Sequence, residues 1–266
     1  MNLNKEQRER YSRQIIMQEV GEAGQEKLLD SSVLVVGAGG LGSPLLYYLT
    51  AAGVGRIGIM DGDTVDLSNL QRQILHTGDA LGKAKTASAA ESLTRLNPDV
   101  KFDLYHKRLN ADNACDLINR YDLTVDASDN FSTKYLVNDA SVLMEKPYSH
   151  AGVLQLQGQI FTHIPKTSCL RCIFPDPPPA QTVPSGREAG ILGAVAGTLG
   201  AMQAAEVIKF LLGEGKLLTD SLLTVDIKTM QFRSIKVKRN PQCPICGKKP
   251  TITDLQKVNY KNPLQR

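Results

Sequence analysis

The stretch that most constrains the fold is a short apolar run that leads directly into a cluster of glycines. Residues 33–36 are apolar and mostly β-branched, which predicts a buried parallel strand. The glycines after it fit the pattern G-x-G-x-x-G with one extra member: Gly37, Gly39, Gly40 and Gly42. Glycines let the backbone approach a phosphate closely, and the amino-terminus of the following helix attracts anions. The stretch predicts a nucleotide-binding turn; the alternative is a tight turn that binds nothing.

A second strand that ends in an acid favours the nucleotide interpretation. Residues 56–60 are predicted to form this strand, and Asp61 follows it directly. The acid comes about 20 residues after the glycines, which is the spacing of a carboxylate that holds ribose hydroxyls. The order of strand, glycine turn, helix, strand and acid is typical of a Rossmann-like site.

The pattern of the whole chain predicts an α/β fold. Strand-like and helix-like segments alternate from residue 33 to about 145, which indicates a mostly parallel sheet with helices on both faces. After Pro147 the pattern changes to antiparallel strands, beginning with residues 151–164. We therefore expect a Rossmann-like, mostly parallel sheet, followed by antiparallel strands and a C-terminal part that two C-x-x-C pairs, at 169–172 and 243–246, would staple through zinc.

We expect three parts along the chain. Residues 1–30 are predicted to form a helical arm, which Gly21 and Gly24 interrupt. Residues 31–247 form the main domain, which contains a proline-rich and mobile loop over 175–186. Residues 248–266 are polar and are expected to form a loose tail.

Composition excludes several classes of protein. The net charge is +4 and the basic residues form no dense run, so we expect no nucleic-acid partner. The first residues are polar and do not resemble a signal peptide, which predicts a cytoplasmic protein. Residues 191–212 are apolar but contain Gln203, Glu206 and Lys209, which favours a core helix over a membrane span.

Polar side chains gather after the second strand, at the edge of the sheet where ligands bind. The candidates for contact with the ligand are Asp61, Asp63, Ser68, Asn69, Arg72, Gln73 and Lys85. Arg72 and Lys85 beside a phosphate-binding turn suit a polyphosphate, whose charge needs more than a helix dipole. The alternative is an ordinary solvated loop.

A third group of polar residues follows the strand at 123–127. Asp129 is placed to meet solvent and ligand, with Asn130 beside it. A carboxylate near a triphosphate most simply holds Mg²⁺, which prefers one or two carboxylates plus phosphate oxygens. The alternative role of Asp129 is to cap the helix that begins near Ser132.

Four of the five cysteines form two C-x-x-C pairs and predict a metal site. The pairs are Cys169 with Cys172 and Cys243 with Cys246. Four thiolates suit a closed, tetrahedral zinc site with a structural role. The alternative is two unrelated reduced pairs. Cys115 is expected to be a buried packing residue, and the four histidines receive no functional role: His76, His106, His150 and His163.

These motifs together resemble the MoeB/ThiF/HesA branch of the ubiquitin-activating-enzyme-like superfamily, over nearly the whole chain to about residue 247. The resemblance rests on the glycine turn, residues 61–63, 68–73, Lys85, residues 126–130, both cysteine pairs, Arg13-Gln14, Asn97-Pro98 and Glu188-Ala189-Gly190. It implies an ATP-dependent adenylyltransferase that acts on the C-terminal glycine of a small ubiquitin-like sulfur carrier (ThiS- or MoaD-like) ending in Gly-Gly. Sulfur transfer in thiamine, molybdopterin or related biosynthesis would follow.

The resemblance also implies roles for single residues. The glycine turn would cradle the phosphates, Asp61 would hold the ribose, and Asp129 would hold Mg²⁺. Asn69, Arg72 and Lys85 would contact phosphates. In the family the arm arginine reaches into the partner subunit, so Arg13 implies a homodimer in which Arg13, Arg72, Lys85 and Asp129 are catalytic.

One departure from the family pattern concerns Gly186. Many relatives carry a cysteine two residues before Glu-Ala-Gly, whereas this chain has Gly186 there, so no thioester is expected at that position. Sulfur is then expected to come from a separate donor protein. Two other functions share part of the pattern: a nicotinamide-dependent oxidoreductase, and a non-catalytic adaptor that only binds the carrier.

Overall fold

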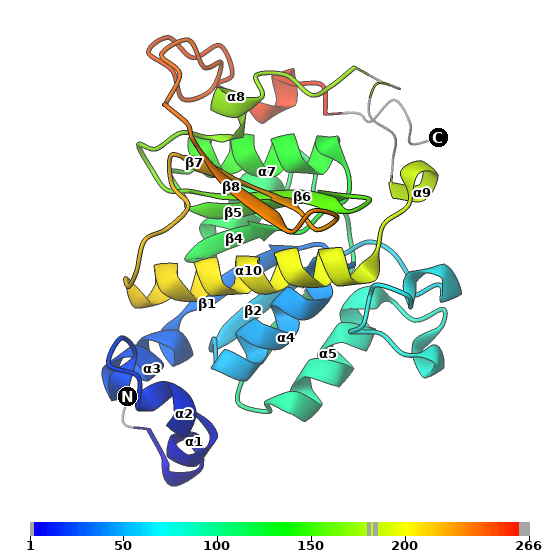
Figure 1. The fold of residues 1–266 in the computed structure, drawn as a ribbon, viewed down its shortest axis with the longest axis vertical. Coiled ribbons are helices and arrows are strands. Elements are labelled where there is room, and N and C mark those ends of the chain that lie inside the picture. Colours follow the sequence, from blue (N-terminus) through cyan, green and yellow to red (C-terminus); the bar gives the residue numbers. More distant parts are fainter. Residues whose placement is uncertain (1–2, 180–181, 183–185, 261–266) are drawn as a thin grey trace.

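A computed structural model describes residues 3–179, 182 and 186–260 of the chain. Its centre is one eight-stranded sheet with the order β3-β2-β1-β4-β5-β6-β7-β8 (Figure 1). The strands are β1 Ser32–Val36, β2 Arg56–Met60, β3 Lys101–Tyr105, β4 Leu123–Asp126, β5 Tyr148–Leu154, β6 Gln157–His163, β7 Ser221–Asp226 and β8 Gln231–Lys236.

The helices are α1 Lys5–Arg10, α2 Ser12–Ile15, α3 Gly21–Asp30, α4 Gly42–Ala52, α5 Lys85–Leu96, α6 Ala114–Asn119, α7 Phe131–Leu143, α8 Leu170–Ile173, α9 Gly186–Ala189 and α10 Gly193–Leu212. Short 3₁₀ helices are η1 Leu67–Asn69, η2 Gly78–Ala80 and η3 Leu255–Lys257. The proline-rich loop was expected to be mobile. Five residues of this loop, 180–181 and 183–185, lie outside the described part of the chain, and the mobility of the loop stays a prediction.

Strand directions confirm the predicted fold class. The pairs β3–β2, β2–β1, β1–β4 and β4–β5 are parallel, whereas β5–β6, β6–β7 and β7–β8 are antiparallel. The sequence predicted the change of pattern after Pro147, but β5 belongs to both halves. It runs parallel to β4 and antiparallel to β6, and so joins the parallel and the antiparallel strands into one continuous sheet.

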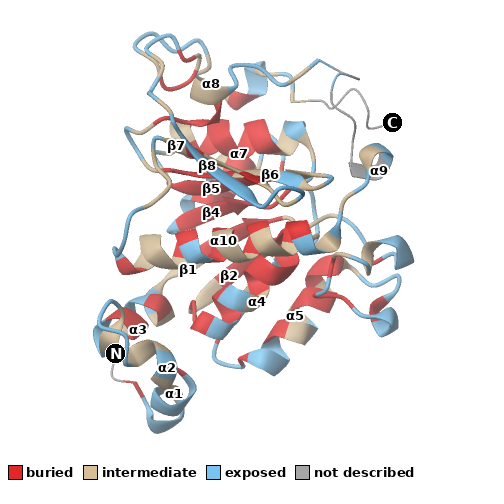
Figure 2. Ribbon diagram, viewed as in Figure 1, coloured by how far each residue is buried: buried red, intermediate tan, exposed pale blue. Residues whose placement is uncertain are grey.

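Helices cover both faces of the sheet, as predicted. One apolar core packs α4, α5 and α10 against one face, and a second packs α6 and α7 against the other. Figure 2 shows the central strands and the helix surfaces facing them as buried, while β8 at the sheet edge is exposed along its length. The inner parallel strands β1, β2 and β4 are almost entirely buried because both of their faces are covered.

Helix α10 is a core helix, as the sequence predicts. By length and composition it could cross a membrane, but its polar residues bind the sheet. Gln203 Nε2 donates to the Asp126 carbonyl at 3.0 Å, and Glu206 accepts from the Thr162 hydroxyl at 2.8 Å. A Cβ at Gly200 would lie 2.3 Å from the Leu41 carbonyl oxygen, so glycine lets α10 pack closely on the beginning of α4.

The arm consists of α1, α2 and α3, and its structure corrects one detail. Gly24 does not interrupt the arm; it lies inside α3, where a Cβ would come 3.0 Å from the Leu212 side chain. A helix interior tolerates glycine when close packing requires it, and α3 here packs on α10. Gly21 has a φ of +58° and does mark a break, since α3 begins there.

The prediction of a loose tail is wrong for the described residues after Gly247. Leu255 is buried in the core beside α7, and the Tyr260 hydroxyl donates to Asp139 at 2.6 Å. Cys115 also differs from expectation. It is half-buried at the edge of the same core rather than fully buried, and burial raises the pKa of its thiol.

Candidate active site and metal centre

The glycine turn lies at the carboxyl ends of β1 and β4, the point of the parallel sheet where ligands bind. Strand β1 has β2 on one side and β4 on the other, so the chain changes direction across the sheet between β1 and β4. Gly37 has a φ of +106°, and a Cβ there would lie 2.7 Å from the Ala127 carbonyl oxygen. A Cβ at Gly42 would lie 2.0 Å from the Gly37 carbonyl oxygen. Only glycine fits at these two positions.

The segment at 68–73 folds back over the glycine turn. A Cβ at Gly40 would lie 3.4 Å from the Arg72 side chain, and one at Gly39 would lie 3.7 Å from the Gln73 amide. The beginning of helix α10 packs against this segment, because Gly193 has no side chain that would collide with the backbone at Arg72. Gln73 is buried, and its Oε1 has no hydrogen-bond partner among the described residues. An unpartnered buried acceptor beside a phosphate-type turn fits a ligand group that donates a hydrogen bond.

Asp61 and Lys85 both lie at this edge, and each already has a partner. The Asp61 carboxylate accepts from the Ala38 and Asp63 backbone N–H groups, each at 2.9 Å. Each carboxylate oxygen keeps a further lone pair, so ribose hydroxyls can still bind. Lys85 is buried, and its Nζ lies 3.5 Å from Asp63, which also pairs with Arg108 at 3.3 Å. Asp63 therefore holds two cations beside the turn rather than facing an anion itself.

Ser68 and Asn69 act locally in this structure. The Ser68 hydroxyl donates to Asp66 at 2.6 Å, and Asn69 Oδ1 accepts from the Asp66 backbone N–H at 3.2 Å. Asp66 is the N-cap of the 3₁₀ turn η1, and Asn69 completes the capping box with it. The Ser68 carbonyl accepts from Arg72 Nη1 at 2.9 Å, which orients the guanidinium. The turn thus holds Arg72 in place over Gly40.

Asp129 and Asn130 follow β4, and the structure separates their roles. Asn130, not Asp129, caps α7: its Oδ1 accepts from the Thr133 backbone N–H at 2.9 Å. Asp129 is exposed, and its carboxylate lies 3.4 Å from the Asn130 amide nitrogen. The capping alternative for Asp129 is therefore wrong, and its exposed carboxylate, just after the carboxyl end of β4, keeps acceptor capacity to spare.

Arg13 is not brought to the glycine turn of its own chain. It is exposed on α2, and the arm is anchored at the opposite end of α4. Gln14 donates to the Ala52 carbonyl at 3.2 Å, and the Tyr11 hydroxyl accepts from Asn97 at 2.8 Å. The 11 residues of α4 separate this end from the glycine turn by about 16 Å.

His76 has no functional role that its place in the sequence predicts, but the structure gives it two contacts. It is buried, and its Nε2 lies 2.9 Å from the Ala38 carbonyl oxygen, so Nε2 carries the proton. Its Nδ1 accepts from the Ser88 hydroxyl at 2.9 Å. Ser88 belongs to α5, the helix that Lys85 begins, so His76 joins the glycine turn to the helix carrying Lys85. No sequence spacing predicts this contact.

We expect the free energy of unfolding to fall as pH falls below about 6.5. Burial, reinforced by the charge of Lys85, lowers the pKa of His76, against opposing effects of the Ala38 carbonyl and Asp61. The unfolded chain then binds the proton more readily than the folded chain does. The stabilisation from neutral His76 is therefore fully present above the ordinary histidine pKa, and it is lost as pH falls from there towards the lower pKa of the folded protein. Each tenfold difference in proton affinity between the unfolded and the folded chain corresponds to about 1.4 kcal/mol. Urea unfolding at several pH values measures this loss of stability.

His76→Gln should make this dependence less steep, because it removes one of the three buried histidines whose pKa burial lowers, while His150 and His163 remain. The matched control is His106→Gln, at an exposed position. An equal pH dependence in His76→Gln and in the unmodified protein would contradict the assignment.

A second unforeseen group lies behind Asp129. Asp126, Lys134 and His150 are all buried, and Asp126 binds both of the others. Burial alone would raise the pKa of Asp126, but the charge of Lys134 and hydrogen bonds from His150 and Ser128 lower it to about 2. Burial lowers the pKa of His150, so this imidazole is neutral and donates from Nδ1.

The four predicted cysteine ligands do meet. All four Sγ atoms lie within 4.8 Å of one another, and the closest pairs are 3.3–3.9 Å apart. A tetrahedral zinc site with Zn–S bonds of 2.3 Å requires sulfur atoms about 3.8 Å apart. The geometry therefore fits a closed tetrahedral site, and the alternative of two unrelated pairs is wrong. Cys169 and Cys243 are fully buried.

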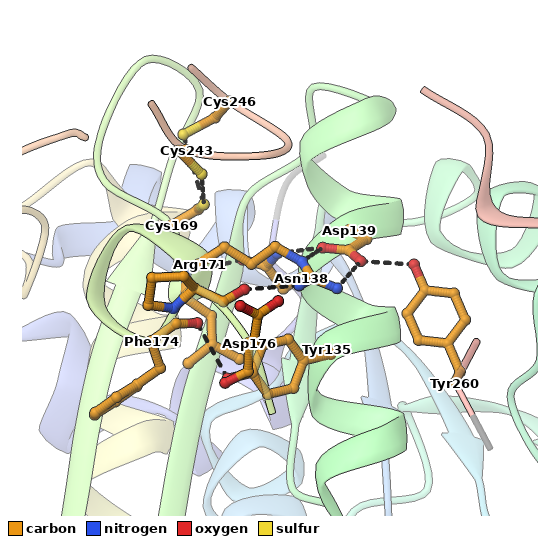
Figure 3. A network of polar contacts seen from close by, with 12 residues as sticks. Tyr135, Asn138, Asp139, Cys169, Arg171, Phe174, Asp176, Cys243, Cys246 and Tyr260 are labelled. Carbon is orange, nitrogen blue, oxygen red and sulfur yellow. Dashed lines mark hydrogen bonds and ion pairs between the residues drawn. The ribbon is translucent and has the colours of Figure 1, made fainter. Parts of the chain in front are cut away.

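The first cysteine pair is tied to α7 through buried polar contacts (Figure 3). Arg171 makes a two-pronged ion pair with Asp139, at 2.7 and 2.8 Å, and Nη1 donates to the Pro175 carbonyl at 2.8 Å. Asn138 accepts from the Leu170 backbone N–H at 2.8 Å. Because α7 begins just after Asp129, the metal centre and the ligand edge share one helix.

Comparison with known proteins assigns the chain to a family. Residues 11–245 match the ThiF family, which is most of the chain. The chain belongs to the ThiF family. It is 48% identical to the sulfur carrier protein adenylyltransferase of Thermus thermophilus, over 98% of both chains. Together with the family match, this shows an enzyme of the adenylyltransferase class.

Other relatives define how far the likeness extends. The chain is 50% identical, over 93% of its length, to the adenylyltransferase and sulfurtransferase MOCS3 of Sus scrofa, but spans only 55% of that protein. Among solved structures, E. coli MccB matches with a TM-score of 0.80 at 24% identity, over 94% of this chain and 75% of MccB. That likeness supports the fold.

Proposed function

We propose that this ThiF-family protein adenylates the C-terminal glycine of a small ubiquitin-like sulfur carrier that ends in Gly-Gly. In this reaction the carrier carboxylate attacks the α-phosphorus of ATP. A new acyl–phosphate bond forms, the bond to the β-phosphate oxygen breaks, and pyrophosphate leaves. The observation that carries the proposal is the packing of Arg72 and Gln73 over Gly40 and Gly39 at the switch point of the sheet.

The residues at this edge suit a triphosphate. Gly37 and Gly42 leave space that a Cβ would fill, so phosphate oxygens can approach the backbone and the first turn of α4. Arg72 and Lys85 would neutralise the phosphates, and Asp61 would bind the ribose hydroxyls. Lys85 would exchange its long 3.5 Å contact with Asp63 for a phosphate oxygen.

Two metal ions complete the proposal. Asp129 would hold Mg²⁺, since an exposed carboxylate with free acceptor capacity beside a triphosphate is the ligand this ion prefers. Bound Mg²⁺ would supply charge neutralisation at the phosphates. The chain's own residues orient the reactants and stabilise developing charge, which needs no protein nucleophile. The four cysteines would hold a structural Zn²⁺, because four thiolates leave no open position.

We extend the proposal to partners and location. The distance between Arg13 and its own glycine turn supports a homodimer in which Arg13 serves the site of the partner subunit. A separate protein would donate sulfur, and the site would work in the cytoplasm, on a carrier of thiamine, molybdopterin or related biosynthesis.

The test is ATP–pyrophosphate exchange with candidate carriers. We expect exchange that requires both Mg²⁺ and a carrier with an intact Gly-Gly terminus. A carrier lacking its last glycine serves as the control. Exchange that ignores the carrier terminus would contradict the proposed substrate.

The same samples test the two alternatives. A nicotinamide-dependent oxidoreductase would change NAD(P)H absorbance, and a non-catalytic adaptor would bind the carrier without ATP. The adenylyltransferase relatives favour exchange over both. Calorimetric titration with ATP separates an adaptor from an enzyme.

We further expect the acyl-adenylate to remain non-covalently bound to the protein. Gly186 stands where many relatives carry a cysteine, the Cys115 thiol has a raised pKa, and the other four cysteines face one another at the metal centre. A thiol of raised pKa is a poor nucleophile at neutral pH because little thiolate is present. A non-reducing gel and an intact mass spectrum of the complete reaction check this.

The control for this prediction is the same reaction with Cys115→Ser, which should look identical. A thiol-sensitive adduct between the two proteins that disappears in Cys115→Ser would show the prediction to be wrong.

A further inference from the structure

The buried cluster of Asp126, Lys134 and His150 lies directly behind the turn that carries Asp129. Asp126 is 0% exposed, His150 is 1% and Lys134 is 8%. Placing ionised groups in a protein interior is costly unless every charge is paired and hydrogen-bonded. The proposed chemistry uses none of the three residues, so their burial needs another reason.

The Lys134 ammonium group makes three hydrogen-bond or ion-pair contacts within the cluster. Its Nζ lies 2.7 Å from the Ala151 carbonyl oxygen, 2.8 Å from the Ser128 carbonyl oxygen and 3.3 Å from Asp126 Oδ2. An ammonium group has three donors and no acceptor, so these contacts satisfy it completely. Lys134 thereby joins α7, on which it lies, to the end of β4 and to β5.

Ser128 is held from two sides by this cluster. Lys134 binds its carbonyl, while Asp126 Oδ1 accepts from its backbone N–H at 3.1 Å and from its hydroxyl at 2.5 Å. His150 occupies the other oxygen of Asp126, with its Nδ1 at 2.7 Å, and so fixes the carboxylate. Every polar group of Ser128 is therefore bound to a buried partner.

The residue after Ser128 is Asp129, and the hydrogen bond of its carboxylate within the described part of the chain is the long 3.4 Å contact with Asn130. Its position must come from the backbone on either side. Ser128 is fixed on one side, and Asn130 is fixed on the other as the cap of α7. The turn also lies against the glycine loop, where a Cβ at Gly37 would come 3.2 Å from the Ser128 backbone nitrogen.

We propose that Lys134 is a positioning residue: through Ser128 and Asp126 it holds the Asp129 carboxylate in register with the glycine turn and so sets the affinity for the divalent metal bound with the nucleotide. This inference rests on the proposed role of Asp129 as the metal ligand. It predicts that loss of the Lys134 contacts weakens metal binding even where the fold is intact.

The test compares Lys134→Met with the double variant Asp126→Asn/Lys134→Met, each in the full-length protein. Lys134→Met alone leaves the buried Asp126 carboxylate without its cation and is expected to lower the melting temperature. The double variant removes both charges, so its melting temperature should return towards that of the unmodified protein. Both variants should bind Mn²⁺·ATP about tenfold more weakly, measured by water-proton relaxation.

Two further variants make the outcome specific. Ser128→Ala removes one hydroxyl contact and no charge, and should weaken Mn²⁺·ATP binding about two- to threefold. Lys146→Met is the matched control. Lys146 follows the opposite end of α7 and donates to the Tyr121 carbonyl at 3.0 Å, so this substitution should leave Mn²⁺·ATP binding unchanged.

Lys134→Arg restores a cation with several donors and should recover part of the metal affinity. A double variant that regains stability and binds Mn²⁺·ATP as the unmodified protein does would overturn the proposal, because the cluster would then only support the fold. Water-proton relaxation is measured without the carrier protein, so it reports Mn²⁺·ATP binding alone. If the unmodified protein binds Mn²⁺·ATP normally but shows no carrier-dependent exchange, the proposed substrate is contradicted. The inference about Lys134 is then still decided by the Mn²⁺·ATP binding of the variants.

Discussion

Asp129→Ala should reduce ATP–pyrophosphate exchange by at least about a hundredfold while the protein remains folded. The carboxylate is exposed at the carboxyl end of β4, beside the glycine turn, and Asn130 rather than Asp129 caps α7. Its removal therefore costs no helix cap and no buried contact. What is lost is the proposed Mg²⁺ ligand, so the effect should fall on the chemical step and on Mg²⁺ dependence.

The matched control for this prediction is Asp30→Ala, which removes an exposed carboxylate at the end of α3. Asp30 precedes β1, so about 17 Å of strand separates it from the glycine turn. Melting temperatures of both variants should equal that of the unmodified protein. Exchange by Asp129→Ala at the normal rate in Mg²⁺ would sink the assignment.

Removal of zinc should destabilise the protein more than any single substitution discussed above. The four thiolates join a segment after β6 to a segment after β8, and the first pair also anchors Arg171 and α7. Structural zinc sites contribute on the order of 10 kcal/mol in small domains, and each kcal/mol shifts the melting temperature of a chain this size by about 2–4 °C. We therefore expect the melting temperature to fall by at least about 20 °C after chelation.

Metal analysis and scanning calorimetry, before and after chelation, measure this effect. Freshly purified protein should contain one zinc per chain, and the paired change Cys243→Ser/Cys246→Ser should reproduce the loss. Cys115→Ser removes a thiol outside the centre and is the control. A zinc-free protein that melts at the original temperature would contradict a structural role.

The Arg171–Asp139 pair explains why removal of zinc should also destabilise residues outside the metal centre. Both side chains are buried, and the guanidinium also holds the Pro175 carbonyl. Separating a buried ion pair leaves an uncompensated charge, which costs about 3–5 kcal/mol. Tyr260 adds a further hydrogen bond to Asp139, so the last described residue depends on the same pair.

The sequence by itself determined the features whose signal is local. The apolar run at 33–36 and the glycines after it specify a strand and a turn, because only glycine fits at Gly37 and Gly42. The C-x-x-C spacing presents two thiolates from each short segment, so the ligand set could be read directly. Alternating strands and helices over 33–145 likewise predicted the parallel sheet and its two covered faces.

The tertiary structure alone decided the contacts between distant segments. Lys134 lies 8 residues from Asp126 and His150 lies 24 residues from it, and they meet because β4 pairs with β5 while α7 crosses back over both. The docking of Tyr260 on Asp139, 121 residues away, is equally invisible in a one-dimensional pattern. From sequence alone, a buried polar residue is predicted to lie on the surface, because its partner is not known. The sequence shows the charge, and only the fold supplies the opposite charge that makes its burial possible.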